Sequence, residues 1–440
     1  MRQMFSRREF LRQTSAGVLL GGLLGRDLLA GTDPASWRKQ SANDKLNLGI
    51  IGVQGRARAN ISGVKDENIV ALCDVDANHL NKVKADFPKA EGYADFRKLL
   101  ERTDLDAVVI STPDHTHAPA AAMALRLGMH VYCEKPLSHS VYEARTLAKI
   151  AANNKRVTQM GTQIHAESNY RRVVELIQAN AIGGVKEVHV WCDKSWSNGR
   201  YSGGKTPVPE NLNWDCWLGP APERAYQEKI HPSQWRRYWD YGGGTLGDMG
   251  CHYIDLPFWA LKLRHPDSVE AEGPPVHAEG TPNNLKVRWT YPARENMPAV
   301  TMNWYDGDAK PKILAEIPMP KDAKGFGSGV LFVGEKGMLV ADYGRLRLLP
   351  EEQFKDFVRP PKTIADSMGH YNEWVHAIKN GGQSLCNFDY SGALTETVLL
   401  GNVAYRAGEK FSWDGANLKV INCPKAEALI RREYRKGWEL

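Results

Sequence analysis

The stretches "LNLGIIGVQGRARAN", residues 46–60, and "NIVALCDVD", residues 68–76, decide the fold of the first half of the chain. The first predicts an apolar strand over 46–51, then a glycine turn and a run compatible with a helix. The second predicts another strand that ends on Asp74, 22 residues beyond Gly52. Strand, glycine turn, helix, strand and acid in this order form a dinucleotide-binding fingerprint.

The residues of the turn indicate how such a site would work. Gly52 lets the backbone approach a pyrophosphate, which sits on amide groups at the positive end of the following helix. Asp74 can accept hydrogen bonds from the adenosine ribose, and its charge repels a 2′-phosphate, so NAD is favoured over NADP. Because Gln54 stands at the second glycine position, with Gly55 after it, a structural glycine turn in another α/β protein stays open.

The pattern continues in "LDAVVISTPDHTHAPAAAMALRLGMHVYCEKPL", residues 105–137. We expect strands over 107–110 and 130–133, with a helix from about His117 to a C-cap at Gly128. Alternating strands and helices favour a parallel, doubly wound sheet, which binds ligands at the carboxyl ends of its strands. The residues expected to contact the cofactor are Gly52, Gln54, Gly55, Arg56, Asp74, Thr112, Pro113, His117, Glu134 and Lys135. For His115, and also for His117, a structural role is the favoured interpretation.

Length and composition indicate a globular protein of two domains. The chain has 440 residues, 42% of them hydrophobic and 25% charged, with a net charge of +6. Its basic cluster near the C-terminus, Arg431 to Lys436, is interpreted as a solvated helix face, so no nucleic-acid partner is expected. The seven cysteines form no C-x-x-C pattern, so neither a disulfide framework nor a metal site is expected.

The N-terminus is similar to a twin-arginine export signal. "SRREFLRQTSAGVLLGGLLG", residues 6–25, places Arg7 and Arg8 ahead of a short apolar run. Arg26 and Asp27 end that run before the roughly 20 residues that a membrane span needs, so no stable span is expected. We therefore expect a signal peptide over 1–30, a polar linker over 31–44, and a periplasmic or cell-envelope location.

The second half predicts a different architecture. Segments such as 185–193, 285–293 and 299–307 alternate or run apolar in strand fashion, between turns rich in glycine and proline. Six of the thirteen tryptophans lie between residues 191 and 239, where aromatic rings either stack on the C–H faces of a sugar or pack a core. In "WRRYWDYGGG", residues 235–244, Arg237 and Trp239 are the candidate substrate contacts.

The stretch "GTLGDMGCHYID", residues 244–255, predicts a helix that places Asp248 and His252 on one face, one turn apart. Three uses are open for this pair: metal ligation, helix stabilisation, and proton transfer. Metal ligation is disfavoured because no third ligand follows at helical spacing. For proton transfer, a histidine suits removal of a hydroxyl proton, a carboxylate can orient it, and Lys135 can stabilise an alkoxide.

Residues 45–410 resemble the Gfo/Idh/MocA oxidoreductase family. The glycine loop, Asp74, "TPDHTH", "EKP" and "GGGTLGDMGCHYID" occur in that family's order. The resemblance implies an N-terminal Rossmann domain over 45–163 and a C-terminal α+β domain with an open, mostly antiparallel sheet over 164–440. It also implies catalytic roles for Lys135, Asp248 and His252, a substrate contact by His165, a cis Lys135–Pro136 bond, and homo-oligomers formed through the sheet.

Three functions remain in competition. The first is an NAD-dependent dehydrogenase acting on a secondary hydroxyl of a sugar, polyol or glycoside. Since an exported enzyme meets no free NAD pool, the cofactor would be held tightly and regenerated in place. The second is an NAD-dependent glycosidase that works by transient oxidation at C3 and elimination. The third, a nucleotide-retaining binding protein, is disfavoured because Lys135, Asp248 and His252 are all present.

Overall fold

A computed structural model describes residues 44–203, 206–317 and 326–440. The predicted signal peptide, and the predicted linker up to residue 43, lie outside the described residues. No helix in the described part of the chain combines the length and apolar character needed to cross a lipid bilayer.

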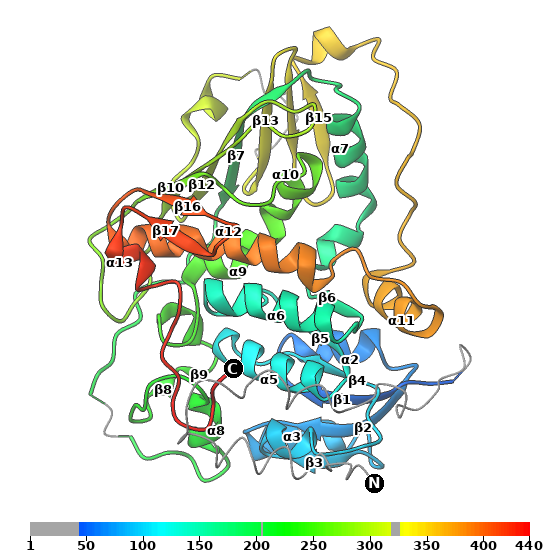
Figure 1. The fold of residues 1–440 in the computed structure, drawn as a ribbon, viewed down its shortest axis with the longest axis vertical. Helices are drawn as coiled ribbons and strands as arrows, with labels where there is room; N and C mark the ends of the chain where they lie inside the picture. Colours follow the sequence, from blue (N-terminus) through cyan, green and yellow to red (C-terminus); the bar gives the residue numbers. More distant parts are fainter. Residues whose placement is uncertain (1–43, 204–205, 318–325) are drawn as a thin grey trace.

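The first half forms a six-stranded, wholly parallel sheet in the order β3-β2-β1-β4-β5-β6, which is the doubly wound order expected for a dinucleotide-binding domain (Figure 1). Its strands are β1 (Asn47–Ile51), β2 (Asn68–Cys73), β3 (Glu91–Tyr93), β4 (Ala107–Ile110), β5 (His130–Cys133) and β6 (Thr158–Met160). Its helices are α2 (Ala57–Gly63), α3 (Ala77–Lys84), α4 (Phe96–Leu99), α5 (Asp114–Arg126) and α6 (Val141–Asn153). Strands β4 and β5 match their predicted bounds residue for residue, because both are apolar runs covered on two faces.

Helix α5 begins at Asp114, earlier than the predicted start near His117. Pro119 lies inside the helix and has no N–H to donate to the carbonyl of His115. Arg432 supplies the missing donor, since its Nη2 lies 2.6 Å from that carbonyl oxygen. A contact more than 300 residues away in sequence therefore allows the helix to run through a proline.

The second half forms a nine-stranded sheet in the order β15-β14-β13-β7-β12-β11-β10-β16-β17. Among the described strand pairs of this sheet only β7–β12 is parallel, so the predicted mostly antiparallel sheet is confirmed. Its strands are β7 (Val185–Cys192), β10 (Ser268–Glu272), β11 (Lys286–Tyr291), β12 (Val300–Asp306), β13 (Gly329–Gly334), β14 (Met338–Ala341), β15 (Leu346–Leu349), β16 (Phe411–Asp414) and β17 (Lys419–Ile421). The accompanying helices are α7 (Ser168–Gln178), α9 (Gly244–Tyr253), α10 (Asp255–Ala260), α11 (His370–Asn380), α12 (Phe388–Ala407) and α13 (Pro424–Glu427).

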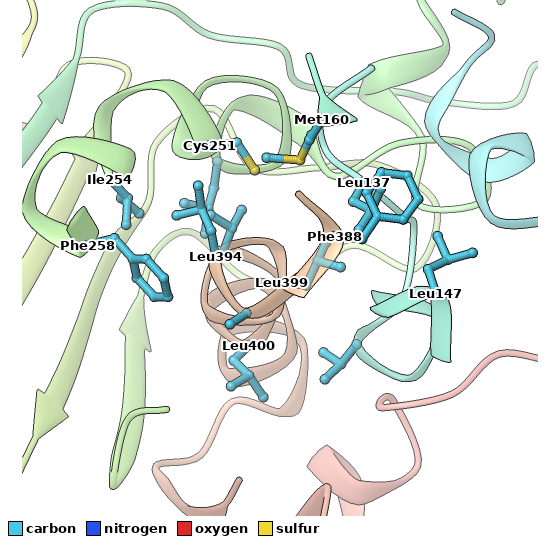
Figure 2. Close-up of a cluster of buried hydrophobic side chains, with 14 of the residues drawn as sticks. Leu137, Leu147, Met160, Cys251, Ile254, Phe258, Phe388, Leu394, Leu399 and Leu400 are labelled. Atoms are coloured by element: carbon cyan, nitrogen blue, oxygen red, sulfur yellow. The ribbon is translucent and has the colours of Figure 1, made fainter. Parts of the chain in front are cut away.

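Helix α12 is buried along nearly its whole length and lies between the two sheets (Figure 1). Figure 2 shows Leu394, Leu399 and Leu400 of α12 within one cluster that also holds Leu137 from the first half and Phe258 from the second. At Gly250 of α9, an added Cβ would stand 3.0 Å from the side chain of Val398, so glycine permits the close approach of α9 to α12. The two halves therefore share one hydrophobic core.

The chain also returns to the first sheet after residue 370. Trp374 of α11 is fully buried among the residues behind β1 and β2, and Lys379 Nζ lies 2.6 Å from Glu67 Oε1. The last strand of the first sheet ends at Met160, three residues before the predicted division, and part of the later chain completes the core of this sheet.

Residues 430–440 differ from the predicted solvated helix, because they are extended and turn-like and are held by specific contacts. Besides its bond to the carbonyl of His115, Arg432 forms an ion pair of 2.7 Å with the buried carboxylate of Glu143. Arg435 pairs with Asp215 at 2.7 Å. Arg432 therefore ties the C-terminal residues to helices α5 and α6, and Arg435 ties them to Asp215 of helix α8 (Trp214–Leu218).

Residues 206–243, here called the cover segment, form the later part of the connection from β7 to α9 and lie against the carboxyl end of the first sheet. The segment contains helix α8 (Trp214–Leu218), the short strands β8 (Glu228–Lys229) and β9 (His231–Pro232), and a 3₁₀ turn over Trp235–Arg237. Trp214 and Trp217 stack at 4.6 Å within an aromatic cluster of its own. Backbone hydrogen bonds of 2.8 Å from Ala77 to Asn211 and from Asn213 to Val75 join it to the loop after β2.

Candidate active site

A cleft with a volume of about 530 Å³ lies between the carboxyl ends of the first sheet's strands and the cover segment. Its floor is formed by the loops after β1, β2, β4 and β5, and its far wall by the cover segment and α9. Nine of the ten predicted cofactor contacts line it: Gly52, Gln54, Gly55, Arg56, Asp74, Thr112, Pro113, Glu134 and Lys135. This is the edge at which a doubly wound sheet binds ligands.

The glycine turn fits the backbone of a bound dinucleotide. Gly52 has φ +80°, and a Cβ added there would stand 2.9 Å from the carbonyl group of Ser111. Gly55 has φ +62° and an added Cβ would meet nothing within 4 Å, which leaves open space above the turn. Asp74 is held at the end of β2 by the amides of Val53, at 3.0 Å, and Asp76, at 2.9 Å. The substitution of glycine by Gln54 thus leaves the tight turn intact.

Two predicted cofactor residues are held firmly in place by their neighbours. Glu134 accepts hydrogen bonds at Oε1 from Asn60, at 3.0 Å, and Gln163, at 2.9 Å. His117 does not line the cleft: its ring nitrogens each lie 2.8 Å from a backbone carbonyl, of Pro136 and Thr112. Its placement favours the structural role, because the ring joins the loops after β4 and β5.

Lys135, Asp248 and Arg236 form a charged cluster in which Lys135 and Asp248 are buried and Arg236 is partly exposed. Lys135 Nζ donates to Asp248 Oδ1 at 2.6 Å and to the Asp248 carbonyl at 2.8 Å, and Arg236 Nε donates to the same carboxylate at 2.7 Å. Burial alone would raise the pKa of Asp248, but Lys135 and Arg236 outweigh it and hold that pKa well below its usual range. The carboxylate is therefore charged and fixes two cations at the cleft. The Lys135–Pro136 peptide bond is cis.

His252 lines the same cleft, one helical turn beyond Asp248 on α9. Its Nδ1 is buried and has no hydrogen-bond partner in residues 44–203, 206–317 and 326–440, so Asp248 orients Lys135 and Arg236 rather than the imidazole. Burial, together with the charge of Lys135, lowers the pKa of His252 well below its usual value. A neutral imidazole at physiological pH can accept a proton.

Asp114 is a site residue that sequence reasoning missed. It is 2% exposed and lines the cleft at the start of α5, and within the described part of the chain neither carboxyl oxygen has a hydrogen-bond partner. Burial raises the pKa of Asp114 to about 7, against the influence of Arg236 and Lys135. The motif "TPDHTH" contains this residue, but its burial depends on the fold and could not be inferred from the motif.

The three predicted substrate contacts lie away from the cleft lining. His165 is 2% exposed, with Nδ1 3.0 Å from both oxygens of Asp255 and its ring stacked on Trp259 at 3.9 Å. Trp239 is 6% exposed and donates to the His277 carbonyl. Arg237 belongs to the 3₁₀ turn, whose other members, Trp235 and Arg236, line the cleft instead. Within the predicted run, Trp235 and Arg236 rather than Arg237 and Trp239 therefore face the cleft.

All seven cysteines are buried and free. One group with the chemistry of metal ligands does occur in the described chain. Asp76, His79 and His231 place their ligand atoms within 4.8 Å of one another at the end of the cleft near Asp74. The sequence spacing of these residues contains no metal pattern, because His231 comes from the cover segment.

Two family models match the chain and together cover more than half of it. Residues 46–162 match the model described as oxidoreductase family, NAD-binding Rossmann fold, and residues 175–307 match the C-terminal alpha/beta domain model of the same oxidoreductase family, GFO_IDH_MocA. The first range coincides with the six-stranded sheet and the second contains α9 and the cover segment.

Curated relatives match over about half of their own length. An inositol 2-dehydrogenase of Salmonella paratyphi B is 28% identical over 190 residues, which are 42% of this chain and 50% of that protein. A glycosyl hydrolase family 109 protein of Saccharopolyspora erythraea is 27% identical over 259 residues, 54% of this chain and 51% of that protein. The WlbA dehydrogenase of Bordetella pertussis, solved with NADH and UDP-GlcNAcA, has a TM-score of 0.60 at 16% identity, covering 84% of this chain and 98% of that one, a likeness of fold alone.

Proposed function

Since the chain belongs to the Gfo/Idh/MocA family of NAD-binding oxidoreductases, we propose that it oxidises a secondary hydroxyl of a sugar, polyol or glycoside. The observation that carries this proposal is the buried cluster in which Asp248 holds Lys135 beside the neutral His252 in the cleft. The relatives named as an inositol dehydrogenase and as a family 109 glycosyl hydrolase support a polyhydroxylated substrate.

Each charged or titratable residue of the cleft has a separate role in the proposed reaction. When bound, NAD supplies the acceptor for the hydride that leaves the substrate carbon. His252, neutral at physiological pH, takes the hydroxyl proton, so the products are a ketone, the reduced cofactor and a proton. Lys135 stabilises the negative charge that develops on the oxygen, and Asp248 keeps the ammonium in place. Arg236, whose guanidinium carbon lies 4.0 Å from the centroid of the Trp235 ring, offers a cation to the rest of the substrate.

NAD would be held by the nine cleft-lining residues of the glycine turn and the loops after β2, β4 and β5. Asp74 favours NAD over NADP because its carboxylate would face the ribose 2′ position. The cover segment lies across the cleft, which supports tight retention of the cofactor and its regeneration in place.

The proposal is tested by purifying the protein without added nucleotide and identifying bound cofactor by mass spectrometry. Sugars, polyols and glycosides are then screened for formation of a keto product. We expect co-purified NAD and a keto product that is lost in the His252→Ala protein. A protein that binds NADP in preference to NAD, or turnover unchanged in His252→Ala, would overturn the proposal.

A second candidate function is an NAD-dependent glycosidase, which the family 109 relative favours. Oxidation at C3 acidifies the proton at C2, a base removes that proton, the aglycone leaves, and the ketone is reduced again. The two functions give opposite results with an aryl glycoside. A dehydrogenase accumulates keto-glycoside with the aglycone still attached, whereas a glycosidase releases aglycone without net change in nicotinamide absorbance.

Location and assembly are also proposals. Export by the twin-arginine route rests on "SRREFLR", residues 6–12, and is tested by cell fractionation of an Arg7→Lys/Arg8→Lys protein, which should stay in the cytoplasm. Homo-oligomers formed through the nine-stranded sheet are supported by the polar side chains that strand β11 exposes, those of Lys286 and Arg288. Light scattering at two protein concentrations measures the oligomeric state.

A further inference from the structure

At the adenosine end of the cleft, two histidines and two aspartates meet from three parts of the chain. Asp76 lies in the loop after β2, His79 in the first turn of α3, and His231 in β9 of the cover segment. Asp76 Oδ2 lies 3.1 Å from His231 Nε2 and 3.8 Å from His79 Nδ1. Ligands about 2.1 Å from a tetrahedral metal ion stand roughly 3.4 Å apart, so these two distances bracket the required separation.

No lysine or arginine of the described chain balances the negative charge of Asp74 and Asp76. Asp74 Oδ1 lies 4.0 Å from His79 Nδ1, so two largely buried carboxylates flank one imidazole. Over the residues that the structure describes, neither carboxylate has a lysine or arginine nitrogen within 4.0 Å, and their other partners are backbone amides and Asn211. Buried carboxylates are normally paired or bound to a metal ion.

The ligand atoms are also held in position from behind. Asp76 Oδ1 accepts hydrogen bonds of 2.8 Å from Asn211 Nδ2 and 2.9 Å from the amide of Asn78, which leaves Oδ2 directed at the two rings. Such outer contacts are typical of metal ligands. Both histidines line the cleft, so an ion can reach them and can keep a fourth position open to water.

We propose that Asp76, His79 and His231 bind one divalent transition-metal ion of the zinc class. A set of two imidazoles and one carboxylate with an open fourth position suits zinc or cobalt better than calcium or magnesium, which prefer oxygen ligands throughout. The ion would join the cover segment to the dinucleotide-binding domain. This site lies at the opposite end of the cleft from Lys135 and Asp248, so the inference goes beyond the proposed reaction.

The test uses the full protein after treatment with a chelator, with and without bound NAD. Zn²⁺ binding is measured by equilibrium dialysis and elemental analysis, and Co²⁺ binding by the visible absorption of a tetrahedral cobalt site. We expect one equivalent of metal in at least one of these states. His79→Gln and His231→Gln should each weaken binding more than about 100-fold, and Asn211→Ala about 10-fold, since Asn211 only positions Asp76.

His376→Gln is the matched control, because His376 is exposed on α11, and should bind metal as the wild type does. The melting temperature in chelator reports folding, and added Zn²⁺ should raise it in the wild type but not in the double variant His79→Gln/His231→Gln. Binding of less than one equivalent in both states, or equal affinity in that double variant, would overturn the proposal. Because no turnover is measured, this result is independent of the outcome for the proposed function.

Discussion

The two ends of the cleft treat buried carboxylates in opposite ways. At one end Asp248 lies between Lys135 and Arg236, at 2.6 and 2.7 Å. At the other, Asp74 and Asp76 meet histidines and amides. Asp114 is also buried, and among the residues that the structure describes no group donates a hydrogen bond to its carboxyl oxygens. All of these residues are aspartates, so direct contact sets their chemistry: Asp248 is charged because Lys135 and Arg236 donate hydrogen bonds to it, whereas Asp114 feels the same two cations without a hydrogen bond from either and has a raised pKa.

The largest effect on kcat is expected at the end of the cleft where Lys135 and Arg236 pair with Asp248. Lys135→Ala removes the group that stabilises the alkoxide and leaves Asp248 with Arg236 alone, so kcat should fall by about 10³-fold. Steady-state kinetics on a substrate from the screen measure this loss. Lys149→Ala, an exposed lysine on α6, should leave kcat unchanged. Equal kcat in the wild type and Lys135→Ala would show that the ion pair is structural.

Asp114→Asn should change how stability depends on pH. Burial raises the pKa of Asp114 to about 7, so between about pH 4 and pH 7 the folded protein keeps a proton that the unfolded chain has released. Stability therefore falls as pH rises through this window. Asparagine carries no charge, and we expect the variant to gain on the order of 2–3 kcal/mol over the wild type between pH 4.5 and pH 8.

Urea unfolding at pH 4.5 and pH 8 measures the gain in free energy of unfolding. Asp306 serves as a control that distinguishes an effect on stability from an effect on catalysis. Burial also raises the pKa of Asp306 to about 7, but Asp306 lies outside the cleft lining. Asp306→Asn should show the same gain in stability without altering the pH profile of kcat/KM. Asp114→Asn should alter both, and a flat response of both would contradict the assignment.

The third effect concerns the adenosine end. Asp74→Ala should weaken NAD binding about 10-fold, the worth of one hydrogen bond to a charged group, and should narrow the preference for NAD over NADP. Calorimetric titration of nucleotide-free protein gives both affinities. Asp86→Ala, at an exposed position of the same domain, is the control. An unchanged ratio of the two affinities would argue against a ribose contact.

The smallest effect distinguishes two adjacent arginines. Arg237 does not line the cleft, so Arg237→Ala should change KM by no more than about twofold. Arg236→Ala removes a cation from Asp248 and should change KM or kcat by more than that. The same substrate and assay serve both proteins. A larger effect at Arg237 would restore the sequence-based choice of substrate contact.

The sequence alone predicted the elements whose signals are local. Strands β4 and β5 are short apolar runs, and α9 starts behind glycines, so the placement of Asp248 and His252 on one helix face followed from spacing. The parallel order of the first sheet followed from alternating strands and helices. Each strand and helix was recognised from hydrophobic periodicity and turn residues, which are local properties of the sequence.

What could not be predicted depends on contacts between distant segments. The burial of Asp114 and the pairing of Asp76 with His231, 155 positions apart, exist only once the cover segment has folded over the sheet. The sequence predicted Arg237 and Trp239 as substrate contacts, whereas Trp235 and Arg236 line the cleft. Trp235 and Arg236 belong to a 3₁₀ turn, and the sequence pattern did not show which side chains of that turn face the cleft. The hydrogen bond from Arg432 to the His115 carbonyl of α5 likewise joins residues that are 317 positions apart.

The buried helix α12 limits how this protein can be divided or recombined. Its Thr395 hydroxyl accepts a hydrogen bond from the Leu137 amide of the first half, and its Thr397 carbonyl accepts one from Trp289 of the second. A fragment ending at residue 163 would lack both α11 and α12 and would expose the apolar surfaces that they cover. The dinucleotide-binding half is therefore not an exchangeable module, and a chimera with a new substrate domain must carry residues 370–407 along with it.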